Sequence, residues 1–251
     1  MKLGSNPAFK EGLQVYLLEG KAFGAFFYLL SLLGLVQFAI LFLPSLDPQG
    51  WMGSAYLFRM SAVAALMLVV YFVLRLTGQE YAPWKFFTLR RWLQQEGLTV
   101  PALAAAHVSL LVVYASALVL LSSPLLVWAG AISRADGFAI LATILLLFSY
   151  AVVYGFWGIV ALAAWDQRLE AKQVFVRCVF GILVFISALV YLPLNPIAFL
   201  LSYLEQTELP PLPFFFGLRL SGAAAHALSQ VALLAAAVAA YSWALKRRST
   251  L

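Results

Sequence analysis

The fold class follows from residues 55–76, AYLFRMSAVAALMLVVYFVLRL, in which Arg59 and Arg75 are the only charged residues. A helix needs about 20 predominantly apolar residues to cross the roughly 30 Å hydrocarbon core of a bilayer. This run is long enough, and Arg59 lies close enough to its outer end to extend its charge toward the headgroups. We therefore predict a transmembrane helix here.

The remainder of the chain has the same character. Of its 251 residues, 64% are hydrophobic and only 10% are charged, and the mean hydropathy is +0.95. A soluble domain is about a quarter charged and near half apolar, so this chain is predicted to be an all-α integral membrane protein. The other expected spans are 22–43, 102–121, 138–164, 174–193 and 221–245, and the third continues to Ile132 if the helix tolerates Pro124 as a kink.

Lysine and arginine define the expected orientation. With a cytoplasmic N-terminus, 13 of the 16 basic residues fall in cytoplasmic segments, and only Arg59, Arg134 and Arg219 fall outside. Six spans then place both termini in the cytoplasm, in a multi-pass protein of the inner, or cytoplasmic, cell membrane. Because this asymmetry accounts for the basic balance, we expect membrane lipids and not nucleic acid as partners. The start of the chain is too polar for the apolar core of a cleavable signal.

Three segments of this single transmembrane domain, 1–251, lie outside the spans of 22–76, 102–193 and 221–245. Residues 1–21 are expected to form an amphipathic interfacial helix with one apolar face, comprising Phe9, Leu13, Tyr16 and Leu17. Residues 194–220 are apolar but interrupted by prolines, which predicts a short re-entrant helix and a proline-rich turn on the outer side. A plain outer loop resting on the headgroups is the alternative.

Residues 78–100 lie within GQEYAPWKFFTLRRWLQQEGLTVP, the third of these segments. Pro83 and Gly97 are typical of the start and end of a helix. On that helix the apolar arc holds Phe86, Leu89, Trp92 and Leu93, whereas Trp84 and Phe87 share the polar side with Arg90 and Arg91. Aromatic residues and arginine are enriched in protein interfaces, so this cytoplasmic helix is predicted to bind a partner. An interfacial helix with an irregular apolar stripe is the alternative.

Motifs for chemistry on this chain are absent from the sequence. The lone Cys178 excludes a cysteine-cluster metal site, no HExxH is present, and Val15 and Ala22 replace the first glycine and the Ser/Thr of a P-loop around Gly20–Lys21. We therefore expect no catalytic residue, metal or cofactor on the chain. An intramembrane enzyme that uses Ser54 or His107 is a minor alternative, and both histidines are expected to pack between helices.

The order of these segments resembles the type-2 ABC transporter permeases, the exporter class. The resemblance includes an Asn–Pro start to the first helix, a Thr-containing cytoplasmic helix with a Pro-led entry into span three, and LNPIAFL at 194–200. It implies a permease subunit that pairs with a second permease and with cytoplasmic ABC ATPases, which bind the ATP and Mg²⁺. The expected coupling residues are Trp84, Phe86, Phe87, Arg90, Arg91 and Trp92. The expected outer gate comprises Asn195, Pro196, Glu205 and Glu208. The alternative function is a membrane scaffold that recruits a cytoplasmic partner through residues 78–100.

Overall fold

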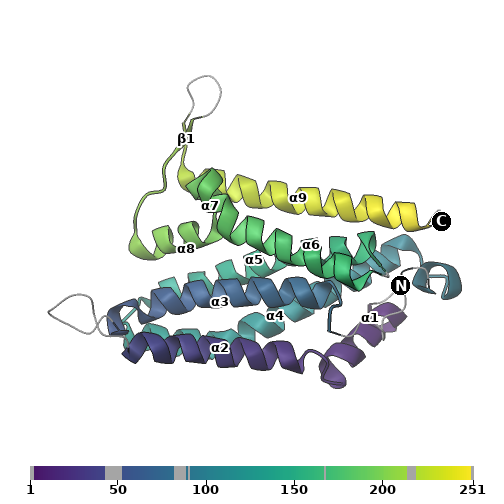
Figure 1. Cartoon of the computed structure of the whole chain (residues 1–251), viewed down its shortest axis with the longest axis horizontal. Coiled ribbons are helices and arrows are strands. Elements are labelled where there is room, and N and C mark those ends of the chain that lie inside the picture. The colour runs from purple at the N-terminus through teal and green to yellow at the C-terminus, as the bar shows by residue number, and fades with distance from the viewer. Residues whose placement is uncertain are drawn as a thin grey trace.

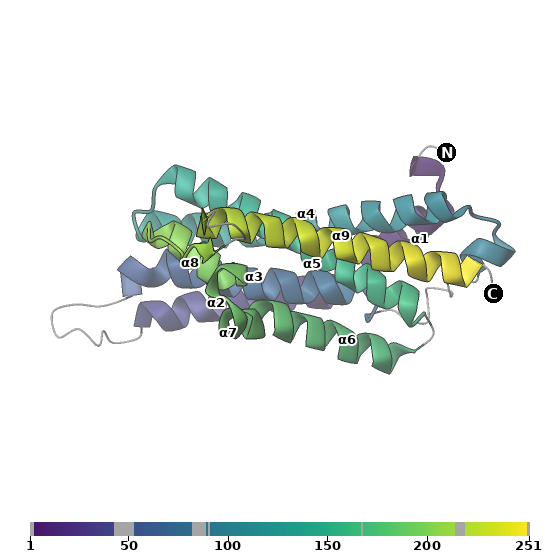
Figure 2. The same cartoon turned by 90° about the horizontal axis from the view of Figure 1, so that it is seen from above.

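The computed structural model describes residues 3–42, 53–81, 89, 91–166, 168–213 and 219–249. The long helices run lengthwise in one elongated bundle (Figures 1 and 2). Within these ranges six helices have the length and hydropathy to cross a membrane, which confirms the expected six-span, all-α architecture. They cover Phe23–Phe42, Tyr56–Thr77, Val100–Ile132, Gly137–Ala164, Leu169–Val190 and Gly222–Arg248.

The elements follow one another along the chain with short connections. The first part contains η1 (Leu3–Ser5), α1 (Pro7–Leu13), η2 (Gln14–Leu18), α2 (Phe23–Phe42), α3 (Gly53–Thr77), η3 (Arg91–Gln95) and α4 (Val100–Ile132). The second part contains α5 (Gly137–Ala164), α6 (Leu169–Gly181), η4 (Ile182–Ile186), α7 (Ser187–Val190), η5 (Leu192–Leu194), α8 (Pro196–Glu205), β1 (Leu212–Pro213), β2 (Arg219–Leu220) and α9 (Gly222–Ser249). Helix α1 and the last turn of α9 lie at one end of the bundle, and α8 and the β1–β2 pair lie at the other (Figure 1).

The third span continues through Pro124 to Ile132 as one helix. Proline has no N–H to donate to the carbonyl four residues earlier, which is that of Leu120. The hydroxyl of Ser123 donates to this carbonyl instead, at 2.9 Å. Because a local side chain replaces the missing donor, the helix extends beyond the 102–121 core of the predicted span.

The fifth span is displaced from the predicted 174–193. It runs from Leu169 to Val190 through α6, the π-helical turn η4 and α7. The backbone of Tyr191 is extended (φ −161°, ψ 118°), two residues before Pro193, so the helix stops although the apolar sequence continues. Hydropathy alone could not place this end, because Leu192 and Leu194 are as apolar as the helix before them.

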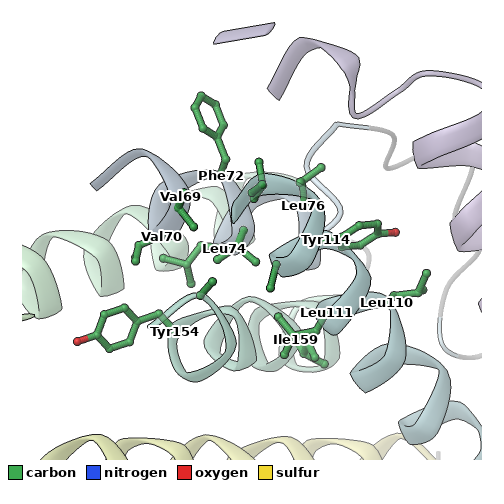
Figure 3. Packing of buried hydrophobic residues seen from close by; sticks show 14 of the residues in the cluster. Val69, Val70, Phe72, Leu74, Leu76, Leu110, Leu111, Tyr114, Tyr154 and Ile159 are labelled. Atoms are coloured by element: carbon green, nitrogen blue, oxygen red, sulfur yellow. The ribbon is translucent and has the colours of Figure 1, made fainter. Parts of the chain in front are cut away.

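Helix α3 is the central helix of the bundle, with two thirds of its most apolar window buried (67%). It packs on α5 at Gly155 and Gly158. A Cβ on Gly158 would lie only 2.6 Å from the carbonyl oxygen of Leu74. The Thr77 hydroxyl lies within hydrogen-bonding distance of the carbonyls of Val73 (2.7 Å) and Gly155 (3.0 Å). Figure 3 shows packed side chains of both helices around this contact, including Leu74 of α3 and Tyr154 and Ile159 of α5. Small residues thus allow the two backbones to approach closely.

The peripheral helices present apolar side chains outward. Leu35 and Phe38 of α2 are 63% and 61% exposed, and Leu189 of α7 is 87% exposed. A water-soluble protein does not expose such a continuous apolar surface. This surface is the one expected of a multi-pass membrane protein whose helices face lipid.

Candidate functional site

The segment 78–100 is anchored to the end of α3 where it begins. The Nε of Arg75 donates to a carboxylate oxygen of Glu80 at 2.9 Å, and the Glu80 side chain is fully buried. The Arg75 guanidinium also lies over the Tyr81 ring, 4.6 Å from its centroid. Burial raises the pKa of the Tyr81 phenol to about 12, so it stays neutral at physiological pH. The first turn of the segment is therefore fixed to the third-last residue of α3.

The segment is also well defined where it ends. Gly97 adopts φ +64°, a left-handed conformation that glycine adopts without strain, which confirms it as the end of the helical turn. The N–H of Leu98 then donates to the Trp92 carbonyl, six residues earlier, at 2.8 Å, which closes the last turn. The Thr99 hydroxyl caps α4 by accepting from the Ala102 N–H at 3.4 Å. The chain thus passes from η3 into α4, the third long helix, through Gly97 and the cap at Thr99.

Arg91 connects this segment to the first helix. Its guanidinium lies 3.3 Å from a carboxylate oxygen of Glu11 on α1 and 3.2 Å from Glu96 in its own segment. The same guanidinium lies 4.9 Å from the centroid of the Trp92 ring. All three charged groups are partly exposed, with side-chain exposures of 24 to 39%. The ion pairs therefore form at the surface, where each contributes less than about 1 kcal/mol.

A further contact joins the segment to the loop between α5 and α6. The backbone N–H of Leu89 donates to a carboxylate oxygen of Asp166 at 2.8 Å. The Lys172 ammonium lies 3.5 Å from the Asp166 carbonyl. The described part of the segment therefore contacts α3, α1, α4 and the α5–α6 loop.

The structure places only part of the predicted coupling surface. Trp84, Phe86, Phe87 and Arg90 lie outside the described residues. Arg91 is at the surface, as its place on the polar arc suggested. Trp92 is buried (4% exposed) and packs in the main core, so it can influence a partner only by supporting the segment from inside. Glu11 and Asp166, which hold the segment, were not among the predicted site residues.

At the opposite end, Asn195 and Pro196 start α8. The Oδ1 of Asn195 accepts from the Ala198 N–H at 2.9 Å and caps the helix, with proline at its first position. Its Nδ2 donates to the carbonyl of Val184 at 2.7 Å and lies 3.0 Å from the Ser187 hydroxyl. Asn195 is only 2% exposed. Its side chain thus fastens α8 to the helix before it.

The other two predicted outer residues lie apart. Glu205, at the end of α8, pairs with Arg59 of α3 at 3.3 Å, and both side chains are exposed. Glu208 lines a cavity of about 740 Å³ with Asp136, Tyr203 and Phe199. This cavity, on the side predicted to be outer, opens between α8 and the starts of α5 and α9, and its volume is in the range of small-molecule pockets. The β1–β2 pair, Leu212 opposite Leu220 and Pro213 opposite Arg219, follows it and was not predicted.

Both histidines pack between helices. His226 donates from Nδ1 to the Pro193 carbonyl (2.8 Å), so its Nε2 accepts from the Tyr150 hydroxyl (2.8 Å). His107 lies 2.7 Å from the Tyr241 hydroxyl. His107 is beside Thr77, whereas Ser54 is in the first turn at the other end of α3. The two residues of the enzyme alternative are therefore not brought together.

Clusters of His, Cys, Asp or Glu suited to a metal ion are absent from the part of the chain that the structure describes. Comparison of the chain with protein-family models, with curated proteins and with solved structures finds no match. What the observations establish is a multi-pass membrane protein with six candidate transmembrane helices.

Proposed function

We propose that this chain is the permease subunit of an ATP-driven exporter of the ABC type, coupled through residues 78–100 to cytoplasmic ATPase subunits. One observation carries the proposal: the described part of this segment is tied to four other elements, through Arg75–Glu80, Arg91–Glu11, Leu89–Asp166 and the start of α4. A connector that receives motion from a partner needs such multiple attachments. A loop that only joins two spans does not need these additional attachments.

The proposal assigns two functions to the two ends of the bundle. At the basic end, ATP binding to the partner closes the ATPase dimer and displaces segment 78–100. At the other end, α8 and the outer cavity lined by Glu208 form the exit of the substrate route, with a second permease subunit completing it. The chain itself carries out no ATP chemistry. The ATP-bound partner binds one permease state more tightly than the other, and this difference in binding free energy biases the permease toward that state.

The test is purification of the full chain from its own membranes, followed by measurement of associated Mg²⁺-dependent ATPase activity. We expect a P-loop ATPase to co-purify, and Arg90→Glu with Arg91→Glu to reduce both its retention and its activity at least tenfold. Retention of the wild-type level of ATPase by this variant would contradict the proposal. A co-purifying partner without ATPase activity would favour the scaffold function instead.

Arg91 needs a control, because its guanidinium also pairs with Glu11. The exchange variant Glu11→Arg with Arg91→Glu restores an ion pair between α1 and the segment but reverses the charge that faces a partner. If Arg91 contacts the ATPase, the exchange remains as defective as Arg91→Glu alone. Recovery of activity in the exchange variant would identify Arg91 as a positioning residue that acts through α1.

A further inference from the structure

A second cavity, of about 530 Å³, lies between the C-terminal ends of α5 and α9. Three arginines line it: Arg168 follows α5, and Arg247 and Arg248 are in the last turn of α9. Trp165 and Trp243 line it as well. The proposed function does not use this cavity, which is distinct from segment 78–100. Its volume is again in the range of small-molecule pockets.

Local contacts hold two of the three arginines in place. Arg248 donates from Nη2 to the carbonyl of Ala164 at 2.9 Å, which closes the C-terminal end of α5. The Arg247 guanidinium lies 5.6 Å from the centroid of the Trp243 ring. The described residues that line the cavity include no acidic side chain. The neighbouring Asp166 accepts from the Leu89 N–H and is not among them.

We propose that this cavity binds the phosphate group of an anionic membrane lipid. A guanidinium group binds two phosphate oxygens at once through paired hydrogen bonds, whereas a lysine ammonium acts as a single point charge. Arg168 and Arg247 are therefore well suited to bind a phosphate group. Basic cavities at the cytoplasmic ends of spans bind phospholipid headgroups, and tryptophan is enriched at the same depth.

The surroundings favour a lipid over a free phosphate ion. Trp243 is 63% exposed on the outward side of α9, in the last turns of a predicted span that ends at Arg248. A lipid can therefore reach the cavity laterally from the bilayer, with its chains along α9 and its headgroup beside the arginines. A free anion would gain nothing from the two indole rings. The proposal does not depend on the exporter function, because lipid retention is measured without an ATPase.

The experiment is native mass spectrometry of the purified full chain after exchange into mixed phosphatidylglycerol and phosphatidylcholine. Arg168→Gln with Arg247→Gln is the test variant, and Arg248 is left intact because it caps α5. Arg134→Gln with Arg219→Gln, two exposed arginines at the other end, is the control with the same change of charge. We expect the test variant to retain phosphatidylglycerol about tenfold less than wild type, and the control to differ by less than twofold. Equal retention by test variant and wild type, or equal loss in the control, overturns the proposal.

Two further arms make the result decisive. Arg168→Lys with Arg247→Lys keeps the charge and is expected to retain more phosphatidylglycerol than the glutamine variant; a full loss here without a fall in thermal stability overturns the headgroup assignment. Inorganic phosphate alone is the second probe. If it raises the melting temperature of the wild type as much as phosphatidylglycerol does, the cavity takes a free anion and the lipid proposal is wrong.

Discussion

Asn6–Pro7 and Asn195–Pro196 use the same dipeptide to start short helices at opposite ends of the bundle. In both, the asparagine oxygen caps the helix, proline occupies the first position, and Nδ2 donates to a carbonyl at 2.7 Å. The carbonyls differ: Asn195 reaches Val184, 11 residues back, whereas Asn6 reaches Ala102, 96 residues away on α4. One dipeptide thus closes a local corner at the α8 end of the bundle and connects two distant elements at the α1 end.

The difference lies in what else holds each helix. Helix α1 is also tied by Glu11 to Arg91 (3.3 Å) and by the Tyr114 hydroxyl to the Gly12 carbonyl (3.4 Å). At α8, the only ion pair among the described residues is the exposed Arg59–Glu205 contact, which is worth little. We infer that the corner at α8 depends on its asparagine more than the corner at α1 does. Three variants test this inference.

The largest effect is expected for Asn195→Ala. It removes the cap of α8 and a buried hydrogen bond together, and should lower the free energy of unfolding by about 2–3 kcal/mol. Tryptophan fluorescence during unfolding in sodium dodecyl sulfate measures the change. Asn195→Ser is the matched control, because serine caps a helix but cannot reach Val184, and about half the loss should remain. A loss under 1 kcal/mol for Asn195→Ala would show that α8 is held by other contacts.

A smaller effect is expected for Asn6→Ala, about 1–2 kcal/mol by the same measurement, since α1 keeps its contacts with Arg91 and Tyr114. Its functional effect should be the larger one: under the proposed function, ATPase coupling falls because the hydrogen bond between α1 and the start of α4, from Asn6 to Ala102, is lost. The paired observation is decisive. If Asn6→Ala destabilises the protein more than Asn195→Ala, the ranking of the two corners is reversed.

The smallest effect is expected for Glu11→Gln, less than about 1 kcal/mol, because the pair with Arg91 is partly exposed. In the Asn6→Ala background the same change should cost more, since α1 then keeps only the Tyr114–Gly12 hydrogen bond of its three polar contacts. A double-mutant cycle measures this coupling. Additive effects would mean that Asn6 and Glu11 hold α1 independently. High salt should reduce the Glu11→Gln effect and leave the Asn6→Ala effect unchanged.

The spans and the caps could be read from the sequence, because both are local properties. Hydropathy located all six spans, an asparagine before a proline marked the start of α1 and of α8, and Gly97 marked the end of η3. The connections of segment 78–100 could not be read in this way. Glu11 and Arg91 are 80 residues apart, and Leu89 and Asp166 are 77 apart. A backbone N–H carries no sequence signal, and a lone glutamate on an amphipathic helix is indistinguishable from a solvated one.

Helix α4 has 33 residues and is therefore about 50 Å long, whereas the hydrocarbon core of a bilayer measures roughly 30 Å. It must project from that core or cross it at a tilt. For a helix of this length, a rotation of about 5° around its middle moves each end by roughly 2 Å. The end at Val100 is the one that Asn6 contacts, through the Ala102 carbonyl, and that segment 78–100 leads into. A displacement of roughly 2 Å at this end therefore corresponds to a rotation of about 5° of the whole helix.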